Sequence, residues 1–458
     1  MTTPLSLAPS SPPSQRFQAV TRRNVHRLPQ WSSLPEPLRE AVDVVARVLP
    51  FRSNRYVVEH LIDWQRVPED PLFQLTFPQP GMLEPQDFQR IRRLLHQGAG
   101  PREVEAAAQE IRQRLNPQPA GQLSHNVPTL DGRRLQGLQH KYRETVLFFP
   151  AAGQTCHAYC TYCFRWAQFV GPAEMRFGGR EVEDLVSYLR LHPEVTDVLI
   201  TGGDAMILKA RLLRRIVEPL LAPELEHVQN IRFGTKALAY WPQRFVTDED
   251  ADDLLRLLEE IEAAGRHGAI MAHASHPVEL QPSIARRAIS RLRGTGAQIR
   301  MQAPVVRRVN DAPEPWAELW REGVQLGMVP YYLFIERDTG PKRYFEVPLA
   351  RTLEIFQQAH RRVSGLARTV RGPVMSAFPG KVRIAGVETI HGERAFVLEM
   401  LQGRSPDWAG RTFFARYDPH ATWLDQLQPA FGEECFFFET EGVSPGAGPP
   451  PPTRLRSL

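Results

Sequence analysis

The chain has 458 residues, of which 42% are apolar and 23% charged, and these are the proportions of a globular protein with a large core. A net charge of +5 without any basic cluster that alternates with aromatic residues argues against nucleic-acid binding. No apolar run is long enough to span a membrane, no apolar signal core opens the chain, and four cysteines argue against a disulfide scaffold, so we expect a cytoplasmic protein.

The N-terminal third predicts helices behind a disordered tail. Residues 1–30 are rich in Pro and Ser and contain no acidic residue, which is typical of disorder. A transit peptide has a similar composition, but the prolines disfavour its amphipathic helix. Apolar side chains recur at helical spacing over 36–64 and 83–116, with turn residues between these segments. We therefore predict a helical N-terminal region over 31–140.

From Val146 onward, short apolar strands alternate with helical stretches, and six strand–helix units imply a parallel sheet with right-handed crossovers. The predicted strands are 146–149, 197–201, 230–235, 269–273, 298–303 and 331–335, with helices between them such as 249–264 and 313–326. The fold class is therefore α/β, with a partial (β/α)6 barrel over 141–365 that is closed or nearly closed. Chemistry in such barrels sits at the carboxyl ends of the strands.

The C-terminal part changes pattern. Short strand-like pieces with turn residues between them predict a small β-rich region over 366–441. These pieces are 382–390, 394–401 and 412–417. Residues 442–458 contain a run of prolines and predict a second disordered tail.

One short stretch, residues 155–165, carries the strongest chemical signal. It holds three of the four cysteines at the spacing C-x3-C-x2-C, whereas Cys435 is remote. The three are Cys156, Cys160 and Cys163. Three thiolates in one loop can ligate a [4Fe–4S] cluster and leave one iron open to a ligand. A zinc knuckle completed by His157, or three unrelated thiols, are the alternatives, and tetrahedral zinc geometry would be strained within so short a loop.

The loop resembles the C-x3-C-x-aromatic-C signature of radical S-adenosylmethionine (SAM) enzymes, and its surroundings resemble the lysine 2,3-aminomutase family of that superfamily. The resemblance runs from about His140 to Glu388 and includes several motifs in the family's order. It implies a radical SAM, pyridoxal phosphate (PLP)-dependent 2,3-aminomutase, an isomerase that moves an amino group from Cα to Cβ of an amino acid. The implied cofactors are a [4Fe–4S] cluster, SAM and PLP. The reduced cluster would cleave SAM to give the radical that takes the β-hydrogen.

The resemblance also assigns residues to SAM. Tyr162 would lie against the adenine, and packing of the loop is a compatible role. Gly202 and Gly203 would let the ligand approach the backbone, and Asp204 would hold the amino group of the methionine part. Gln302, at the end of the fifth predicted strand, would support SAM.

Two further segments match the family at strand ends. Lys236 stands where the family commonly carries arginine, and it precedes a matching segment at 241–244. It would either meet an anionic group or be solvated. His273 and His276 match a His-x-x-His-Pro run, for which we expect hydrogen bonds in the core or a turn rather than acid–base chemistry.

Lys381 matches the lysine that holds PLP covalently in the family. Such a lysine must be neutral to react, so we expect its surroundings to lower its pKa through burial or adjacent cations. A surface lysine after a Pro-Gly turn is the alternative. The family's two phosphate-binding arginines align with Lys141 and Thr145, which leaves open a radical SAM reaction without PLP on an amino-acid-like substrate.

The substrate residues depart from the lysine-specific pattern. Arg165 matches the arginine that pairs with the substrate α-carboxylate, and guanidinium binds carboxylate bidentately. The two aspartates that bind the distal ammonium of lysine align with Arg337 and Val374. Arginine repels an ammonium group, so we expect a substrate other than lysine, with an acidic amino acid such as glutamate as the candidate. Neutralisation of Arg337 inside the protein is the alternative, and the acids available for it are Glu336, Asp338 and Glu346.

A non-enzymatic iron–sulfur or zinc module is the alternative of a different class, but it would not explain the run at 201–204 or Lys381. As partners we expect the amino acid substrate and an electron donor such as a flavodoxin or ferredoxin, with no nucleic acid and no membrane. A homo-oligomer is compatible with the sequence.

Overall fold

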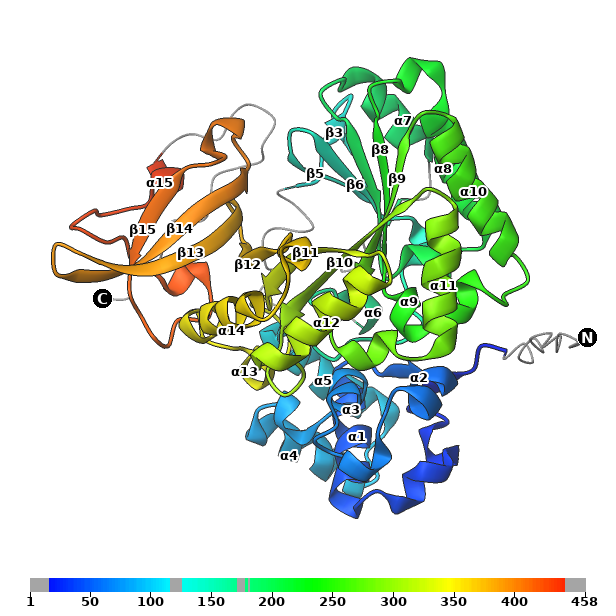
Figure 1. The fold of residues 1–458 in the computed structure, drawn as a ribbon. Helices are drawn as coiled ribbons and strands as arrows, with labels where there is room; N and C mark the ends of the chain where they lie inside the picture. Colours follow the sequence, from blue (N-terminus) through cyan, green and yellow to red (C-terminus); the bar gives the residue numbers. More distant parts are fainter. Residues whose placement is uncertain (1–15, 116–125, 171–177, 180–181, 441–458) are drawn as a thin grey trace, which may run out of the picture.

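A mixed sheet of eleven strands dominates the structure, a computed structural model that describes residues 16–115, 126–170, 178–179 and 182–440 (Figure 1). The strands lie side by side in chain order. They are β5 (Leu138–Tyr142), β6 (Thr145–Phe148), β7 (Asp197–Ile200), β8 (Asn230–Thr235), β9 (His267–His273), β10 (Gln298–Val305), β11 (Val329–Ile335), β12 (Arg371–Ser376), β13 (Gly380–Ile390), β14 (Glu393–Gly403) and β15 (Thr412–Arg416).

Strands β6 to β12 run parallel, whereas β5 at one edge and β13, β14 and β15 at the other pair antiparallel. The six predicted parallel strands are all confirmed within one or two residues. A seventh, β12, was not predicted, because its sequence contains Gly372 and Pro373 and lacks a strand pattern. Among the described strands, β6 and β11 pair with β5 and β12 rather than with each other, so the sheet remains open.

Helices connect the parallel strands and pack along one face of the sheet, as Figure 1 shows for α8, α10, α11 and α12. Their apolar sides and the strands share one core, which includes Leu258, Ile270 and Trp320. The helices from the sheet region onward are α6 (Ala167–Val170), α7 (Val182–Leu191), α8 (Ala210–Val217), α9 (Ala237–Tyr240), α10 (Ala251–Ala263), α11 (Ser283–Gly294), α12 (Pro313–Gln325), α13 (Lys342–Phe345), α14 (Leu349–Arg361) and α15 (Phe437–Thr440).

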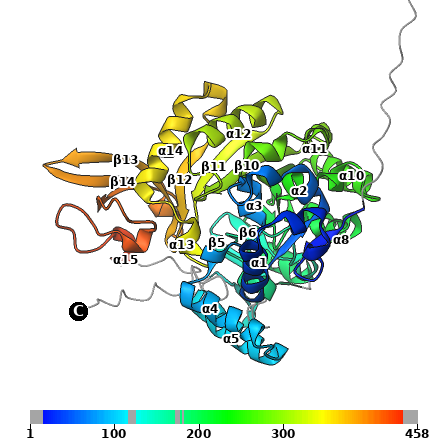
Figure 2. The same ribbon diagram turned by 90° about the horizontal axis from the view of Figure 1, so that it is seen from below.

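The N-terminal region forms a separate group of helices beneath the sheet (Figures 1 and 2). It contains α1 (Glu36–Val48), α2 (Arg55–His60), α3 (Pro71–Thr76), α4 (Pro85–His96) and α5 (Pro101–Leu115). Two short antiparallel pairs lie outside the main sheet: β1 (Ala19–Thr21) with β2 (Arg52–Asn54), and β3 (Thr129–Leu130) with β4 (Arg133–Arg134). The strands β2, β3, β4 and the start of β5 fall within 31–140, where we predicted only helices.

The predicted N-terminal tail is wrong over residues 16–30. Strand β1 pairs with β2, Val20 and Val25 are buried, and Phe17 packs edge-on against Trp241 at a centroid distance of 5.0 Å. A few well-placed apolar side chains thus anchor a segment whose average composition resembles a disordered chain. Residues 1–15 and 442–458, the rest of the two predicted tails, lie outside the described residues.

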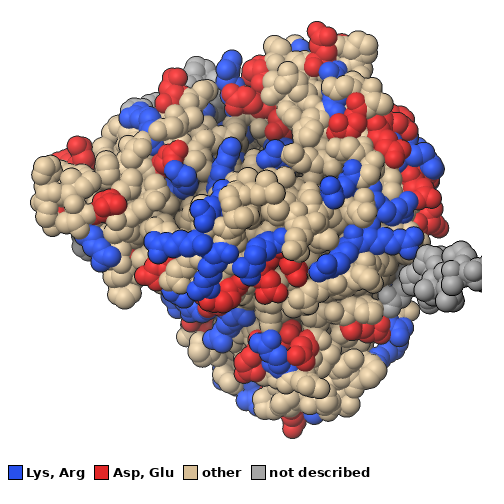
Figure 3. Space-filling model, viewed as in Figure 1, with Lys and Arg blue, Asp and Glu red and all other residues tan. Residues whose placement is uncertain are grey.

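Lys and Arg side chains form a band over α11, α12 and α14 on the face shown in Figure 3. Several of them pair with acids on nearby helices, such as Arg286 with Glu322 at 3.7 Å. No helix in the described ranges is long and apolar enough to cross a membrane.

Candidate active site

The cysteine loop lies between β6 and α6 and is fixed by the N-terminal region. The backbone N–H of Tyr159 donates to the carbonyl of Arg52 at 2.7 Å, and that of Thr161 donates to the carbonyl of Leu75 at 2.9 Å. The side chain of Asn54 donates to the carbonyl of His157 at 3.2 Å. The loop is therefore held from below by segments that precede it by about a hundred residues, which gives the cysteines a defined position.

The three thiols of the loop are half-buried and free, and Cys435 is exposed. Burial, followed by the adjacent Cys160, raises the pKa of the Cys163 thiol to about 12. Burial raises the pKa of Cys156, and the charges of Asp204, Cys163 and Cys160 add to this effect in that order. Cys160 and Cys163 thus lie close enough to Cys156 for their charges to act on it, and three thiols in one loop match the ligand number of a three-cysteine cluster. No set of three His, Cys, Asp or Glu side chains in the described residues has the arrangement of a single-ion site.

His157, the fourth ligand of the zinc alternative, is directed into an aromatic cluster. Its ring lies 5.5 Å from that of Phe17 and stacks on Trp241 at 6.5 Å. Burial, with Arg244 and Arg52, lowers the pKa of His157 to about 3. The side chain therefore acts as a neutral core residue next to the loop.

Gly202 and Gly203 lie close against the segment that leads into the cysteine loop. A Cβ on Gly203 would lie 2.3 Å from the carbonyl oxygen of Thr155, which is too short for any larger residue. A Cβ on Gly202 would lie 2.5 Å from Nε2 of Gln154, the end of a side chain, and 3.1 Å from the carbonyl oxygen of Gly153. The prediction gave these glycines close contact with a ligand, whereas the close contact that the structure contains is with the segment leading into Cys156.

Asp204 joins the turn after β7 to the turn after β8. Its Oδ1 accepts from the hydroxyl of Thr235 at 2.6 Å and from the backbone N–H of Met206 at 2.8 Å, and its Oδ2 accepts from the backbone N–H of Lys236 at 2.8 Å. The side chain also caps the short helix η8 (Ala205–Ile207). Both oxygens are thus engaged by the protein, a positioning role that the sequence did not predict.

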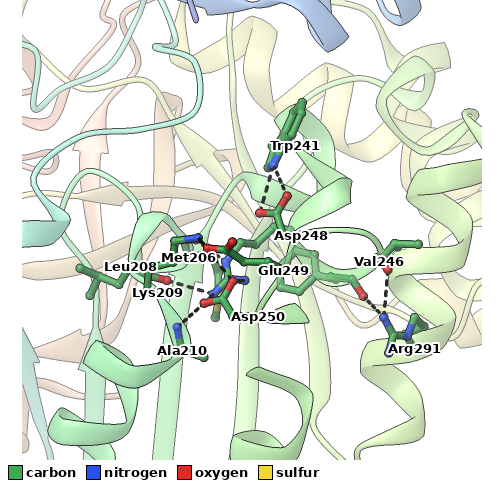
Figure 4. A network of polar contacts seen from close by, with 12 residues as sticks. Met206, Leu208, Lys209, Ala210, Trp241, Val246, Asp248, Glu249, Asp250 and Arg291 are labelled. Carbon is green, nitrogen blue, oxygen red and sulfur yellow. Dashed lines mark hydrogen bonds and ion pairs between the residues drawn. The ribbon is translucent and has the colours of Figure 1, made fainter. Parts of the chain in front are cut away.

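A network of polar contacts reinforces the same two loops (Figure 4). Arg244 donates to the carbonyl oxygens of Met206 at 2.9 Å and Leu208 at 3.0 Å. It also pairs with Asp250 at 2.9 Å, and Asp250 accepts from the backbone N–H of Ala210 at 2.7 Å. The family-like segment 241–244 therefore braces the turn that carries Asp204.

Lys236 is neither solvated nor open to an anion. Its Nζ lies 2.7 Å from Oε1 of the fully buried Glu279 and donates to the hydroxyl of Ser275 at 3.2 Å. The same hydroxyl lies 3.3 Å from that of Tyr162, whose ring is buried in the core shared with the N-terminal helices. His276 accepts from the backbone N–H of Val278 at 3.4 Å, which confirms its expected turn role.

A cavity of about 250 Å³ lies on the inner face of the sheet. Every strand from β5 to β14 contributes at least one lining residue, so the sheet curves around it. Four predicted site residues line this one cavity: Arg165, Gln302, Arg337 and Lys381. Phe164 and Arg165 follow Cys163 directly, so the cysteine loop adjoins the cavity. In all, five cationic side chains and a single carboxylate line it: Lys141, Arg165, Arg232, Arg337, Lys381 and Asp197.

Lys381 extends from β13 into the cavity. Its Nζ donates to Oε1 of Gln402 at 2.9 Å and lies 5.1 Å from the ring centroids of both Tyr142 and Tyr332. Burial lowers the pKa of Lys381 to about 7, and the charge of Arg232 adds to the effect. The expected lowering is confirmed, and the surface-lysine alternative is wrong. An amine with a pKa of about 7 in a cationic cavity fits covalent attachment of PLP, because a large fraction of it is neutral near pH 7.

Arg165 and Arg337 lie near the same aromatic ring, that of Phe164. Each guanidinium carbon lies 5.2 Å from the centroid of Phe164. Nη1 of Arg165, and Nε and Nη2 of Arg337, are buried without a hydrogen-bond partner among the described residues. Burial lowers the pKa of Arg165 to about 10. The charge of Cys163 opposes this lowering, and the charge of Arg337 adds to it. Two guanidinium groups with buried nitrogens that lack hydrogen-bond partners, in one cavity, are the chemistry of a site for anions.

Of the internal partners considered for Arg337, Asp338 forms a long ion pair with it, and the other two carboxyl groups are engaged elsewhere or poorly suited. Asp338 approaches Nε only to 3.8 Å. Glu346 accepts from the hydroxyl of Thr422 at 3.0 Å. Burial raises the pKa of Glu336 well above its usual range, with Glu346 as the next cause, so that carboxyl is poorly suited to carry a compensating charge.

Several lining residues had no signal in the sequence. Gln402 meets Lys381 because the two are cross-strand partners in the β13–β14 pair. Oδ1 of Asp197, at the start of β7, lies 2.7 Å from Nε of Arg232 on β8. Val374, aligned with the second substrate aspartate, is fully buried and does not line the cavity, whereas Ser376 on the same strand does.

The chain is similar in sequence to several aminomutases. Relatives named "Putative L-lysine 2,3-aminomutase" include one from Aquifex aeolicus, 29% identical over 87% of this chain and 93% of its own length, and one from Treponema pallidum, 30% identical over 60% of this chain and 74% of its own length. A glutamate 2,3-aminomutase of Clostridioides difficile is 28% identical over 46% of this chain and 47% of its own length. No protein-family model matches the chain.

Solved structures give weaker likenesses. A radical SAM methyltransferase from Sphaerobacter thermophilus matches with a TM-score of 0.35 and 17% identity, over 62% of this chain and 93% of that one. SuiB of Streptococcus suis, bound to its precursor peptide, matches with a TM-score of 0.33 and 12% identity, over 59% and 57%. Scores at this level support no conclusion about the fold.

The chain belongs to the lysine 2,3-aminomutase family of radical SAM enzymes. It is therefore an enzyme of the radical SAM isomerase class, and the non-enzymatic alternative is set aside. The family uses a [4Fe–4S] cluster, SAM and PLP.

Proposed function

We propose that the chain is a PLP-dependent 2,3-aminomutase that acts on an amino acid with a second, distal carboxylate. The proposal rests on one observation: Arg165 and Arg337 line the same cavity as Lys381, and both carry buried nitrogens without a hydrogen-bond partner in the described residues. A buried cation without a partner is costly, which favours a ligand that supplies the anion.

Separate residues hold the cluster, SAM and PLP. Cys156, Cys160 and Cys163 hold the cluster, and the open sheet works as a partial radical SAM barrel around the cavity. The turn after β7, with Gly202, Gly203 and Asp204, presents SAM to the cluster, and Tyr162 and Gln302 border it. Lys381 holds PLP. When bound, the cluster and SAM supply a radical able to remove an unactivated hydrogen, and PLP supplies a group that carries the migrating nitrogen.

The substrate is held between two guanidinium groups. Arg165 pairs with its α-carboxylate, and Arg337 pairs with its distal carboxylate. Both contacts are of the charge-assisted, bidentate type that arginine favours. The sheet and its covering helices exclude water and stray hydrogen donors from the reacting atoms. A distal ammonium group would instead face Arg337, where the like charges repel.

The relative named as a glutamate 2,3-aminomutase supports a substrate of this class. Identity near 28% over half the chain does not distinguish it from the relatives named for lysine, so the choice rests on Arg337. We also propose that a small external one-electron donor, such as a flavodoxin or ferredoxin, reduces the cluster.

The test is anaerobic reconstitution with iron, sulfide, SAM, PLP and dithionite, followed by incubation with L-glutamate, L-aspartate or L-lysine. We expect a β-amino acid from an acidic substrate and little from lysine. In Arg337→Asp, turnover of the acidic substrate should fall by about a hundredfold or more, because breaking a buried charge pair costs about 2–5 kcal/mol. Reductive cleavage of SAM, followed as release of 5′-deoxyadenosine, should remain.

Two outcomes would contradict the proposal. Efficient β-lysine production by the wild type would show that Arg337 is neutralised inside the protein. Conversion of an amino acid at the same rate with and without PLP, by protein first depleted of it, would favour the PLP-independent radical SAM reaction instead.

A further inference from the structure

A segment that is rich in arginine and free of acids lies beside the cysteine loop. Residues 16–27 include four arginines and no acidic residue: Arg16, Arg22, Arg23 and Arg27. Strand β1 pairs with β2, and the backbone N–H of Arg55 in α2 donates to the carbonyl of Gln18 at 3.0 Å, so the segment is fastened to the N-terminal region. The composition of this segment predicted a disordered tail. The structure instead gives it a fixed place, and the proposed reaction leaves its charges without a role.

Phe17 is the contact between this segment and the cysteine loop. Its ring lies 5.5 Å from that of His157, the residue that directly follows Cys156 in the chain. The guanidinium carbon of Arg52 lies 5.5 Å from the centroid of the Phe17 ring, and the carbonyl of Arg52 accepts from the backbone N–H of Tyr159 in the loop. Phe17 and Arg52 are half-buried, so two neighbouring rings lead from the surface to a cysteine of the cluster.

Most charges of the segment are available to a partner. Arg16, Arg23 and Arg27 are exposed, and none of them forms an ion pair with a described residue. Arg22 differs, because it pairs with Asp43 at 3.6 Å. The surface beside the loop therefore presents several positive charges that no acid in the described ranges offsets. Such a surface attracts a partner of negative charge and orients it during the encounter.

The proposed reaction requires an electron from outside the chain whenever the cluster is reduced. Electron transfer between proteins becomes much slower as the distance grows, so a donor must dock where the cluster lies close to the surface. Such encounters use small interfaces, which complementary charges bring together. Tyr162 and Tyr240, which also adjoin the cysteines, are buried in the core shared with the N-terminal helices and give a donor no access.

On the basis of the external donor in the proposed function, we propose that residues 16–27 and Arg52 form the docking face for an acidic one-electron donor protein, a flavodoxin. The anionic flavin hydroquinone loses one electron and becomes a neutral semiquinone, and the cluster gains that electron and passes from the 2+ to the 1+ state. No atom is transferred. Phe17 and His157 lie between the docked donor and Cys156, and the arginines around them orient the donor.

The test measures the binding of an oxidised bacterial flavodoxin to the full-length, cluster-containing protein by titration calorimetry at low and at physiological salt. The variant is Arg23→Glu/Arg27→Glu, because both side chains are exposed and make no hydrogen bond or ion pair with a described residue. The matched control is Arg93→Glu/Arg102→Glu, which changes the net charge equally at two exposed arginines of α4 and α5. These two helices lie away from α2 in both Figure 1 and Figure 2.

In the wild type the affinity for flavodoxin should fall severalfold from low to physiological salt, because ions screen the charges of both surfaces. Arg23→Glu/Arg27→Glu should weaken binding by about tenfold or more and the control by less than about twofold, since only the former reverses charges within the docking face. Reduction of the cluster by flavodoxin hydroquinone, followed as bleaching of its visible absorbance, should slow by a similar factor in the variant. Dithionite is too small to need this face, so its rate of reduction should stay unchanged.

Equal flavodoxin affinity in the wild type and in Arg23→Glu/Arg27→Glu would overturn the docking face and leave the proposed function intact, because dithionite still supports turnover. A variant that instead loses binding to a single-stranded RNA oligonucleotide would assign the face to a nucleic acid. Equal losses in the variant and in the control would show that the donor responds to net charge rather than to this face. A wild type that binds neither flavodoxin nor an acidic ferredoxin would overturn the face as well. Failure of dithionite to support SAM cleavage in the wild type would contradict the proposed function itself.

Discussion

Lys381 has the surroundings that a reactive lysine needs, and they predict a distinct pH dependence. Burial, the charge of Arg232 and that of Arg371 lower its pKa to about 7, against the opposing charge of Asp197. Because the neutral amine is the reactive form, the rate of PLP attachment should rise through about pH 7 and level off above it, whereas an ordinary lysine would gain reactivity up to about pH 10.

This profile can be measured by trapping bound PLP with borohydride and identifying the labelled peptide. The label should be on Lys381 at every pH tested, and Lys381→Arg should abolish it. A rate that still climbs steeply above about pH 9 would show that the lysine has an ordinary pKa.

The cysteines give a second prediction at the residue scale. Anaerobic protein should hold about four irons and four sulfides per chain, and Cys160→Ala should lose them, because a cluster with two protein ligands is weakly held. Cys435 is exposed and remote from the loop, so Cys435→Ala should keep the cluster. Iron and sulfide analysis of the two variants checks this, and loss of the cluster in Cys435→Ala would refute the three-cysteine site.

Most of the individual site residues could be assigned from sequence, and their partners could not. The cysteine spacing and the context of Lys381 are local patterns. Asp204 accepts hydrogen bonds from residues that follow a different strand, and Lys236 is ion-paired with Glu279 in the loop after β9. No local sequence pattern reveals either set of partners. Glycine showed the same limit: the pair at 202–203 indicated a close approach correctly, but not which atoms approach.

At the scale of elements, the loops after the parallel strands are joined to one another before any ligand is considered. Short helix η12 (Pro277–Leu280), which follows β9, carries Glu279, whose Oε2 accepts from the backbone N–H of Ser275 at 2.5 Å and of His276 at 3.2 Å. Its other oxygen pairs with Lys236 after β8. This buried pair ties two neighbouring strand ends.

The pair predicts a specific pattern of stability. Lys236→Met leaves a buried carboxylate without its cation and should destabilise the protein by about 3–5 kcal/mol. Lys236→Met/Glu279→Gln should recover a large part of this loss, because glutamine removes the charge and still accepts from the two backbone N–H groups. Chemical unfolding of both variants measures the difference. A double variant no more stable than Lys236→Met would show that the charge of Glu279 is not the cause.

Elements of the parallel sheet were predictable because each is a short apolar run between helical segments. Strand β12 and the register of β13 against β14 were not, since β12 contains Gly372 and Pro373 and register depends on pairing across the sheet. That register is what places Gln402 beside Lys381. The cavity could therefore be predicted in its chemistry but not in its full lining.

For the whole molecule, the site depends on parts of the chain that are far apart in sequence. The sheet contributes the cavity, and the β13–β14 pair contributes Lys381 and Gln402. The N-terminal region, which lies beneath the sheet in Figure 1, supports the cysteine loop through backbone hydrogen bonds. The helical region thus has a task beyond its own core: it contacts the loops that follow β6 and β8, at the carboxyl ends of the parallel strands.

Asn54 makes hydrogen bonds to both of these loops. Its Nδ2 donates to the carbonyl of His157 at 3.2 Å and to that of Tyr240 at 2.9 Å, and its Oδ1 accepts from the backbone N–H of Val57 at 3.0 Å. All of these groups are buried. Asn54→Ala would leave two carbonyl groups and one N–H group without partners, at a cost of about 1–3 kcal/mol for each unsatisfied group.

We therefore expect Asn54→Ala to loosen the cysteine loop as well as lower stability. The reconstituted cluster should be lost in air several times faster than in the wild type, as measured by the decay of its visible absorbance. The matched control is Asn24→Ala, because Asn24 also makes three hydrogen bonds in the N-terminal region, to Ala19 and Thr21, but none to the cysteine loop. Asn24→Ala should lower the free energy of unfolding and leave the rate of cluster loss unchanged. Equal rates of cluster loss in the two variants would show that the N-terminal region stabilises the chain without holding the loop in place.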